Sequence, residues 1–158
     1  MSYDTLDEVD RGILHLLQQD ARNVTTTEIG DAVGVSASTV GNRLRELREK
    51  GVIDGYYPQI DYHDAGFPLR VLFICTASIP DREDLAERAL DAPGVVTVRE
   101  IMAGVENLHV EAVATTRDDV ADVARKLDEL GLEVVEEVLV KNEHVQPFDH
   151  FGGDTVSE

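Results

Sequence analysis

The chain opens with apolar and polar residues in the period of an α-helix. In the stretch LDEVDRGILHLLQQDAR the apolar side chains lie three and four positions apart, so they share one face of a helix. Acidic residues fill the first turn, where the helix dipole favours negative charge. The apolar face consists of Leu6, Val9, Ile13, Leu16 and Leu17. We therefore expect an amphipathic helix that buries this face.

Two further segments predict a helix-turn-helix. TTTEIGDAVGV is typical of a short helix that Thr25 or Thr26 caps. Ser36 is positioned to cap a third helix, which Gly51 ends. Between the two helices lies a tight turn in which Gly34 is free to take a positive φ.

The chain divides near residues 60–69, because the pattern before this point is helical and strands and helices alternate after it. GVIDGYYPQID predicts a short two-stranded wing that turns at its Asp-Gly pair. From there the expected order is strand, helix, strand, strand, helix, strand, over residues 69–79, 81–92, 94–104, 107–116, 117–131 and 132–145. This β-α-β-β-α-β order predicts a ferredoxin-like sandwich, with both helices on one face of an antiparallel sheet.

The fold class is therefore α+β, in four parts. We expect a winged helix-turn-helix at 1–60, a linker at 61–69, a ferredoxin-like domain at 70–146 and a flexible tail at 147–158. As an alternative for the tail, Phe148 and Phe151 dock on a partner subunit. The first strand is apolar on both faces, yet two helices cover only one face. We therefore expect a dimer that packs sheet against sheet.

Charge is spread unevenly along the chain. The formal net charge is −18, with net −4 in residues 1–60 and net −14 in residues 61–158. Only 3 of the 14 basic residues are lysine, and this composition indicates a halophilic protein whose surface carboxylates maintain solubility in high salt. Local charge is then the better guide to partners, and residues 36–50 hold four bases against two acids.

The third helix has the surface of a recognition helix. Its exposed face begins with small hydrogen-bonding side chains and ends with bases, which suits contact with base edges and then with phosphates. The expected DNA-contacting residues are Ser36, Ser38, Thr39, Asn42, Arg43, Arg45 and Arg48. Two alternatives are a solvated face with Arg–Glu pairs and a protein-interaction module.

These residues resemble a known family. The helix-turn-helix is similar along its whole length to that of the Lrp/AsnC, or feast/famine, transcription regulators, and the resemblance extends over about residues 5–146. It rests on Ile29-Gly30, Val33-Gly34-Val35-Ser36, Arg43-Leu44, Leu47 and Gly51 at the expected spacings. The resemblance implies sequence-specific binding of double-stranded DNA by dimers, which often form tetramers or octamers. It also implies that residues 70–146 bind a small effector, usually an amino acid, and mediate oligomerisation.

The resemblance places the effector near the loop MAGVENLHV. The candidate effector-binding residues are Gly104, Glu106 and Asn107. Asn107 stands where amino-acid-binding relatives commonly carry Asp, and an amide holds an ammonium group less well than a carboxylate does. Glu106 is the adjacent substitute. The alternative is that this stretch is only a hairpin turn.

Other function classes have weaker support. An architectural or adaptor protein without a small effector is one alternative. Sirohaem decarboxylases share the two-domain plan, but they carry an arginine-rich stretch where this chain reads VIDGYYPQID, so we expect no enzyme and no catalytic residues. The histidines have no diagnostic metal-site spacing, so we expect no metal and no cofactor. No apolar run reaches the roughly 18 residues that span a bilayer. Without a secretory signal either, we expect a cytoplasmic protein that binds no membrane.

Overall fold

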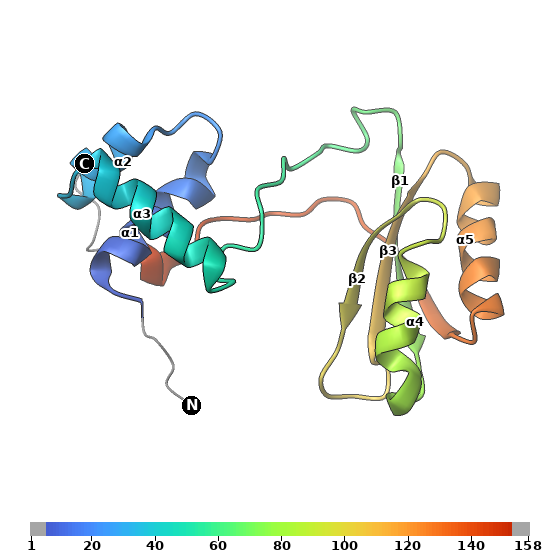
Figure 1. Cartoon of the computed structure of the whole chain (residues 1–158). Coiled ribbons are helices and arrows are strands. Elements are labelled where there is room, and N and C mark those ends of the chain that lie inside the picture. Colours follow the sequence, from blue (N-terminus) through green and yellow to red (C-terminus); the bar gives the residue numbers. More distant parts are fainter. Residues whose placement is uncertain (1–5, 153–158) are drawn as a thin grey trace. The chain divides into compact units, whose positions relative to one another are not determined.

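The structure is a computed structural model that describes residues 6–152. These residues form two compact units, one of residues 6–58 with 144–152 and the other of residues 59–143 (Figure 1). Each unit is described by itself. Within the described residues, no helix combines the length and the apolar character needed to cross a membrane.

The first unit contains the three predicted helices, α1 (Glu8–Asp20), α2 (Thr26–Val33) and α3 (Ala37–Glu49). Each begins at a side chain that accepts a hydrogen bond from a backbone N–H three residues later: Asp7, Thr25 and Ser36. In α1 and α2 the side chain at the third helical position also accepts a hydrogen bond from the backbone N–H of the cap residue, which completes a capping box. The helices enclose a core of Ile13, Leu14, Ile29, Val40, Leu47 and Ile53.

The turn between α2 and α3 depends on two glycines. Gly34 has a φ of 81°, in the left-handed region that other residues rarely adopt, as the sequence predicted. A Cβ at position 30 would lie 2.5 Å from the carbonyl oxygen of Val35, so only glycine lets α2 approach the turn. The Gly30 carbonyl accepts hydrogen bonds from the N–H groups of Gly34 and Val35, at 2.8 and 3.0 Å.

The segment after α3 differs from the prediction. Residues 52–61 form no strand, so the expected two-stranded pairing is absent from this part of the structure. The N–H groups of Val52 and Ile53 instead donate to the carbonyl of Leu47, and this closes the C-terminus of α3. Ile53 is buried in the core, and Pro58 has no N–H for a strand ladder.

The C-terminal segment also differs from the expected flexible tail. The described part of that tail, residues 147–152, belongs to the first unit together with residues 144–146. It ends in the single turn η2 (Asp149–Phe151), which lies beside α1 (Figure 1). The N–H of Phe148 donates to Oε1 of Gln18 at 3.1 Å, and Phe151 packs against the core of the same unit. Phe151 therefore docks within its own chain. The rest of the expected tail, 153–158, lies outside the described residues.

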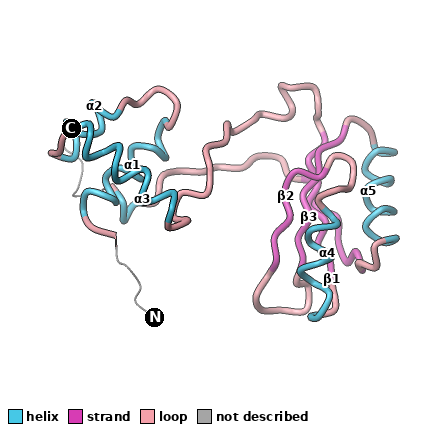
Figure 2. Tube along the Cα trace, viewed as in Figure 1, coloured by secondary structure: helices cyan, strands magenta, loops and turns pink. Residues whose placement is uncertain are grey.

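The second unit has the predicted ferredoxin-like order. Its elements are β1 (Leu69–Thr76), η1 (Ile79–Asp81), α4 (Arg82–Ala89), β2 (Val95–Glu100), β3 (Leu108–Ala114), α5 (Arg117–Glu129) and β4 (Glu133–Leu139). The strands form one antiparallel sheet in the order β2-β3-β1-β4, and Figure 2 shows it with its two helices. One face of β1, Val71, Phe73 and Cys75, is buried in a core with residues of α4 and α5. Burial raises the pKa of the Cys75 thiol to about 11, as for an unreactive core cysteine.

The other face of the sheet is partly apolar and includes a buried carboxylate. Leu72 and Ile74 of β1 are half-buried and stand opposite Glu111 and His109 of β3. Glu111 is only 4% exposed, and its charge is compensated by Arg70, which pairs with it, and by Arg99, whose Nη1 lies 3.9 Å from its Oε2. Among the described residues, neither α4 nor α5 shares a core with this side of β1.

Candidate nucleic-acid interface

The start of α3 is held by a group of hydroxyl side chains. Oγ of Ser36 accepts from the N–H of Thr39 at 3.2 Å, and it lies 2.9 Å from Oγ1 of Thr39 and 3.2 Å from Oγ of Ser38. Thr39 is half-buried, whereas Ser36 and Ser38 are exposed. Ser36 and Thr39 therefore shape the helix start, and Ser38 is the hydroxyl on the open face.

Asn42 and Arg45 form the centre of that open face. Both are exposed, and Nη2 of Arg45 donates to Oδ1 of Asn42 at 3.3 Å. This contact orients the two side chains toward each other one turn apart. The amide N–H groups of Asn42 and further guanidinium N–H groups of Arg45 remain as donors, and these two residue types make the bidentate contacts that distinguish bases in the major groove.

Arg43, one of the expected DNA-contacting residues, pairs with two carboxylates of the first unit. Its Nη1 lies 2.5 Å from Oδ2 of Asp7 and 3.2 Å from Oδ1 of Asp10, so it ties α3 to the start of α1. The hydrogen bond that Arg43 donates to the Asp7 carboxylate raises the pKa of Arg43. The pKa of Asp7 is lowered chiefly by the hydrogen bond that the Asp10 backbone N–H donates to it, and also by Arg43. Two carboxylates thus compensate the charge of Arg43, and these ion pairs hold α3 against the start of α1.

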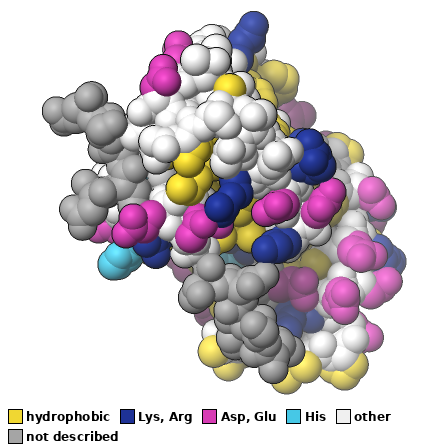
Figure 3. Space-filling model, turned by 60° about the vertical axis from the view of Figure 1, so that its left-hand side comes forward, with side chains coloured by type: hydrophobic (Ala, Val, Ile, Leu, Met, Phe, Trp, Pro, Cys, Tyr) yellow, Lys and Arg dark blue, Asp and Glu magenta, His cyan; other side chains and the backbone are white. Residues whose placement is uncertain are grey.

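Arg48 lies over the ring of Tyr56, a residue that was not among the expected DNA-contacting residues. Its guanidinium carbon lies 5.6 Å from the centre of the Tyr56 ring, at cation–π distance. Tyr56 is 44% exposed and Tyr57 is 82% exposed, so two aromatic side chains follow the basic end of α3. In the sequence, the only sign of these aromatic side chains near the helix is the Tyr-Tyr pair directly after the helix-turn-helix. From the sequence alone, this pair is assigned to a strand of the wing. On the face drawn in Figure 3, basic side chains lie interleaved with acidic ones.

The expected effector loop is only partly open to a ligand. Asn107 is 5% exposed, its Oδ1 accepts from the N–H of Ala77 at 2.8 Å, and its Nδ2 donates to the Ala77 carbonyl at 2.9 Å. This pair of bonds fastens the end of β1 to the start of β3. Gly104, with a φ of 113°, and Glu106 are exposed in the β2–β3 turn. The Asn107 amide thus makes its hydrogen bonds within the fold rather than to a ligand.

Comparison with known proteins agrees with this geometry. A family model described as winged helix-turn-helix DNA-binding matches residues 6–54. The transcriptional regulator LrpA of Pyrococcus horikoshii is 34% identical over 121 residues, which cover 75% of this chain and 82% of that protein. The regulator AldR of Mycobacterium tuberculosis is 46% identical over 67 residues, but these cover 42% of this chain and 37% of that relative.

Solved structures have the same fold. The crystal structure of MtbAldR has a TM-score of 0.73 and 26% identity, and covers 90% of this chain and 99% of its own. A transcriptional regulator from Neisseria meningitidis, solved as a complex with L-Met, has a TM-score of 0.73 at 22% identity, and covers 90% of this chain and 94% of its own. The relatives are named as transcriptional regulators, which favours a regulator over an enzyme. With the helix-turn-helix and the long match to LrpA, the chain belongs to the Lrp-type helix-turn-helix family of DNA-binding transcriptional regulators.

Proposed function

We propose that the chain is a sequence-specific regulator that reads a two-fold operator through the open face of α3. The observation that carries this proposal is the joint exposure of Ser38, Asn42 and Arg45 on a helix that Arg43 anchors to α1. A fixed helix with exposed bidentate donors can discriminate base pairs. Arg48 and Tyr56 would contact the flanking backbone.

The proposed working unit is a dimer, which further association extends to a tetramer or octamer. The open sheet face supports this part of the proposal, because Leu72 and Ile74 are apolar and neither helix covers them. A two-fold pairing of sheets would give the assembly two recognition helices, matched to two half-sites of an inverted repeat.

A small effector, such as an amino acid, is the proposed modulator. The support is the L-Met complex of the Neisseria regulator of the same fold. In the expected loop, Gly104 and Glu106 are the exposed candidates, since the Asn107 amide is bonded to Ala77.

The acidic composition supports a high-salt habitat. In molar salt the release of counterions from DNA contributes little affinity, so base contacts and apolar burial must supply more of it. This condition favours a specific reader over an architectural protein that binds by charge alone, because the chain carries a net charge of −18.

Selection of bound fragments from genomic DNA tests the proposal. The purified full chain is incubated with fragments in molar KCl, and the retained DNA is sequenced. We expect a small set of sites that share an inverted repeat. Retention without sequence preference would favour the architectural alternative, and no retention at either low or high salt would overturn the proposed function.

A further inference from the structure

Four exposed side chains form a single stripe along α3. Ser38, Asn42, Arg45 and Glu49 follow one another at intervals of four, three and four residues, and residues at this spacing lie on one face of a helix. The opposite side of α3 is buried in the core of the first unit. Glu49, which was not among the expected DNA-contacting residues, therefore belongs to the open face that the proposed function assigns to DNA.

The first turn of α3 holds no acidic residue, unlike the first turns of the other described α-helices. α1, α2, α4 and α5 each have one or two acids there, where the helix dipole favours them. An acid at this end of α3 would repel the phosphates of DNA, so its absence fits a helix whose start enters the groove. Glu49 is the one acidic side chain on a stripe whose other members can donate hydrogen bonds.

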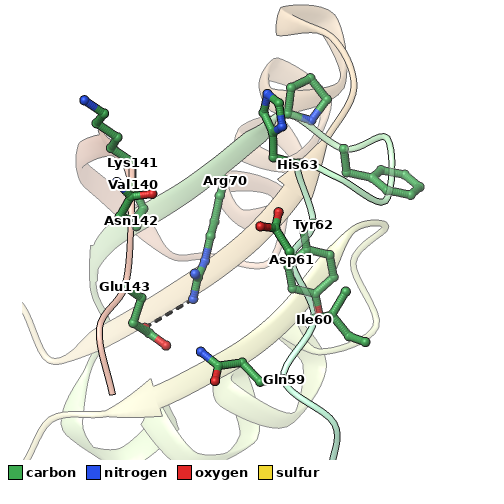
Figure 4. A pocket seen from close by; sticks show the side chains of 12 residues that line it. Gln59, Ile60, Asp61, Tyr62, His63, Arg70, Val140, Lys141, Asn142 and Glu143 are labelled. Carbon is green, nitrogen blue, oxygen red and sulfur yellow. Dashed lines mark hydrogen bonds and ion pairs between the residues drawn. The ribbon is translucent and has the colours of Figure 1, made fainter. Parts of the chain in front are cut away.

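Bases in the second unit pair with nearby carboxylates. In the cavity that Figure 4 shows, Nη2 of Arg70 donates to Oε2 of Glu143 at 3.2 Å. On α5, Arg125 pairs with Asp122, which lies three residues before it. Each of these carboxylates is partly compensated by its base and is therefore less available to a partner.

Arg45 does not pair with the acid on its own stripe. Its Nη2 donates to Oδ1 of Asn42, three residues before it, whereas Glu49 lies four residues after it, at the spacing of a helical ion pair. Among the described residues, the Glu49 carboxylate has no hydrogen-bond or ion-pair partner. The open face thus presents donors at Asn42 and Arg45 and a separate, uncompensated acceptor at Glu49.

An uncompensated carboxylate on this face discriminates between the groups of DNA. A carboxylate only accepts hydrogen bonds, whereas the side chains of Asn42 and Arg45 can donate. In the major groove, the N4 amino group of cytosine is the donor that suits a glutamate, and guanine presents acceptors alone. Glu49 lies about 6 Å beyond Arg45 along the helix axis. This distance corresponds to about two base-pair steps of DNA.

We propose that Glu49 is a specificity-determining residue that accepts a hydrogen bond from the N4 amino group of one cytosine in each half-site. Where the DNA offers no such donor, the carboxylate meets acceptor atoms and phosphates, and the complex is weaker. The inference rests on the proposed function and deepens it, because it adds a residue to the face through which α3 reads the operator.

Selection of bound duplexes from a randomised DNA library, with the full chain in molar KCl, tests this role. The unsubstituted chain should select a motif in which one position of each half-site is a C·G pair. Glu49→Gln should lower the preference at this position about tenfold and retain the preference at the other positions. Since the amide of Gln also donates, adenine should become acceptable there.

Two matched variants separate a base contact from a change of charge. Glu129→Gln alters the last residue of α5, which has the same length as α3 and whose Arg125 likewise bonds to the residue three positions before it. Glu46→Gln removes an exposed charge from α3 beside the stripe. Both variants should select the unsubstituted motif. If Glu46→Gln relaxes the same position as Glu49→Gln, the assignment to Glu49 is overturned.

The selected motifs also distinguish failure of this inference from failure of the regulator. If the unsubstituted chain selects a motif that Glu49→Gln leaves unchanged, the role of Glu49 alone is refuted. A change of affinity in Glu49→Gln that is equal on all sequences refutes it as well, because the carboxylate then faces phosphates only. If the unsubstituted chain selects no motif, the proposed function itself fails.

Discussion

Nη1 of Arg43 on the recognition helix lies 2.5 Å from the carboxylate of Asp7 at the start of α1. If this pair positions α3, Arg43→Ala and Asp7→Asn should have the same two effects. Each should lower the free energy of unfolding by about 1 kcal/mol or less, because both partners are partly exposed. Each should also weaken operator binding. If Arg43 instead contacts DNA, Arg43→Ala alone will weaken binding and Asp7→Asn will not.

The ion pair between Asp7 and Arg43 should make the free energy of unfolding depend on pH. The pKa of Asp7 is below its ordinary value of about 3.8, chiefly through the Asp10 backbone hydrogen bond and then through Arg43. A lowered folded-state pKa stabilises the protein above the ordinary value, and this stabilisation is lost as the pH falls through the folded-state pKa. The stability difference between the unsubstituted chain and Asp7→Asn should therefore be constant near neutral pH and shrink below about pH 4. Urea unfolding across this range measures it, and a difference that grows on acidification would contradict the assignment.

The local features of the fold and the order of the elements could be predicted from the sequence, but long-range side-chain pairings could not. Ser36 and Gly34 identified the start of α3 and its turn because a cap and a left-handed turn are local requirements. The hydrogen-bond partners of Arg43 and Asn107 were not predicted, because they lie 36 and 30 residues away. A helical wheel describes one helix and contains no information on such partners.

Composition also misled the interpretation of the chain end. The Pro, Gly and acidic residues after 146 suggested a flexible tail, but Phe151 packs on the core of the first unit. Similarly, GVIDGYYPQID has the turn residues of a hairpin, yet Ile53 completes the core and the N–H groups of Val52 and Ile53 close the C-terminus of α3. In both places an apolar residue packs in the core of the first unit, and this tertiary packing decides the conformation against the preference of the local sequence.

Arg45→Ala tests the proposed reading of bases. We expect a loss of about 1–3 kcal/mol in operator affinity and relaxed preference at one base position, as for a bidentate base contact. Because Arg45 and Asn42 share a hydrogen bond, the Asn42→Ala effect should not add independently. Arg125→Ala, an exposed residue of α5, is the control and should bind like the unsubstituted chain. An equal loss on all DNA sequences would make Arg45 a phosphate contact.

Two glycine substitutions should change stability in opposite directions. Gly30→Ala places a Cβ 2.5 Å from a backbone oxygen, so it should cost about 2 kcal/mol or more. Gly41→Ala meets no atom within 4 Å and lies inside α3, so it should stabilise the first unit by about 0.5–1 kcal/mol. Thermal unfolding measures both. A neutral Gly30→Ala would mean that α2 moves away from the turn without cost.

Phe151→Ala tests whether the C-terminal segment stabilises the DNA-binding unit. Removing a half-buried aromatic ring from the edge of this core should cost about 1–3 kcal/mol. Val145→Ala is the control from the same segment, because Val145 is 64% exposed, whereas Phe148 packs edge-on against the Phe151 ring at 5.0 Å and would not be independent. Hydrogen exchange of α1 should increase in the first variant and change much less in the second. If the amides of α1 exchange as slowly in Phe151→Ala as in the unsubstituted chain, the segment contributes no stability to this unit.

Ile74→Lys tests the open sheet face as the dimer contact. Ile74 is half-buried beside His109 of β3, and a lysine there stays solvated in a monomer but is buried in a sheet-to-sheet dimer. We expect a shift from dimer to monomer in sedimentation velocity and a marked loss of affinity for a two-fold operator, because the second recognition helix no longer binds through a linked partner. Leu90→Lys, at the exposed residue directly after α4, is the control and should remain dimeric. If Ile74→Lys also stays dimeric and binds DNA normally, the subunits associate through another surface, and the two faces of β1 are apolar for a reason unrelated to dimerisation.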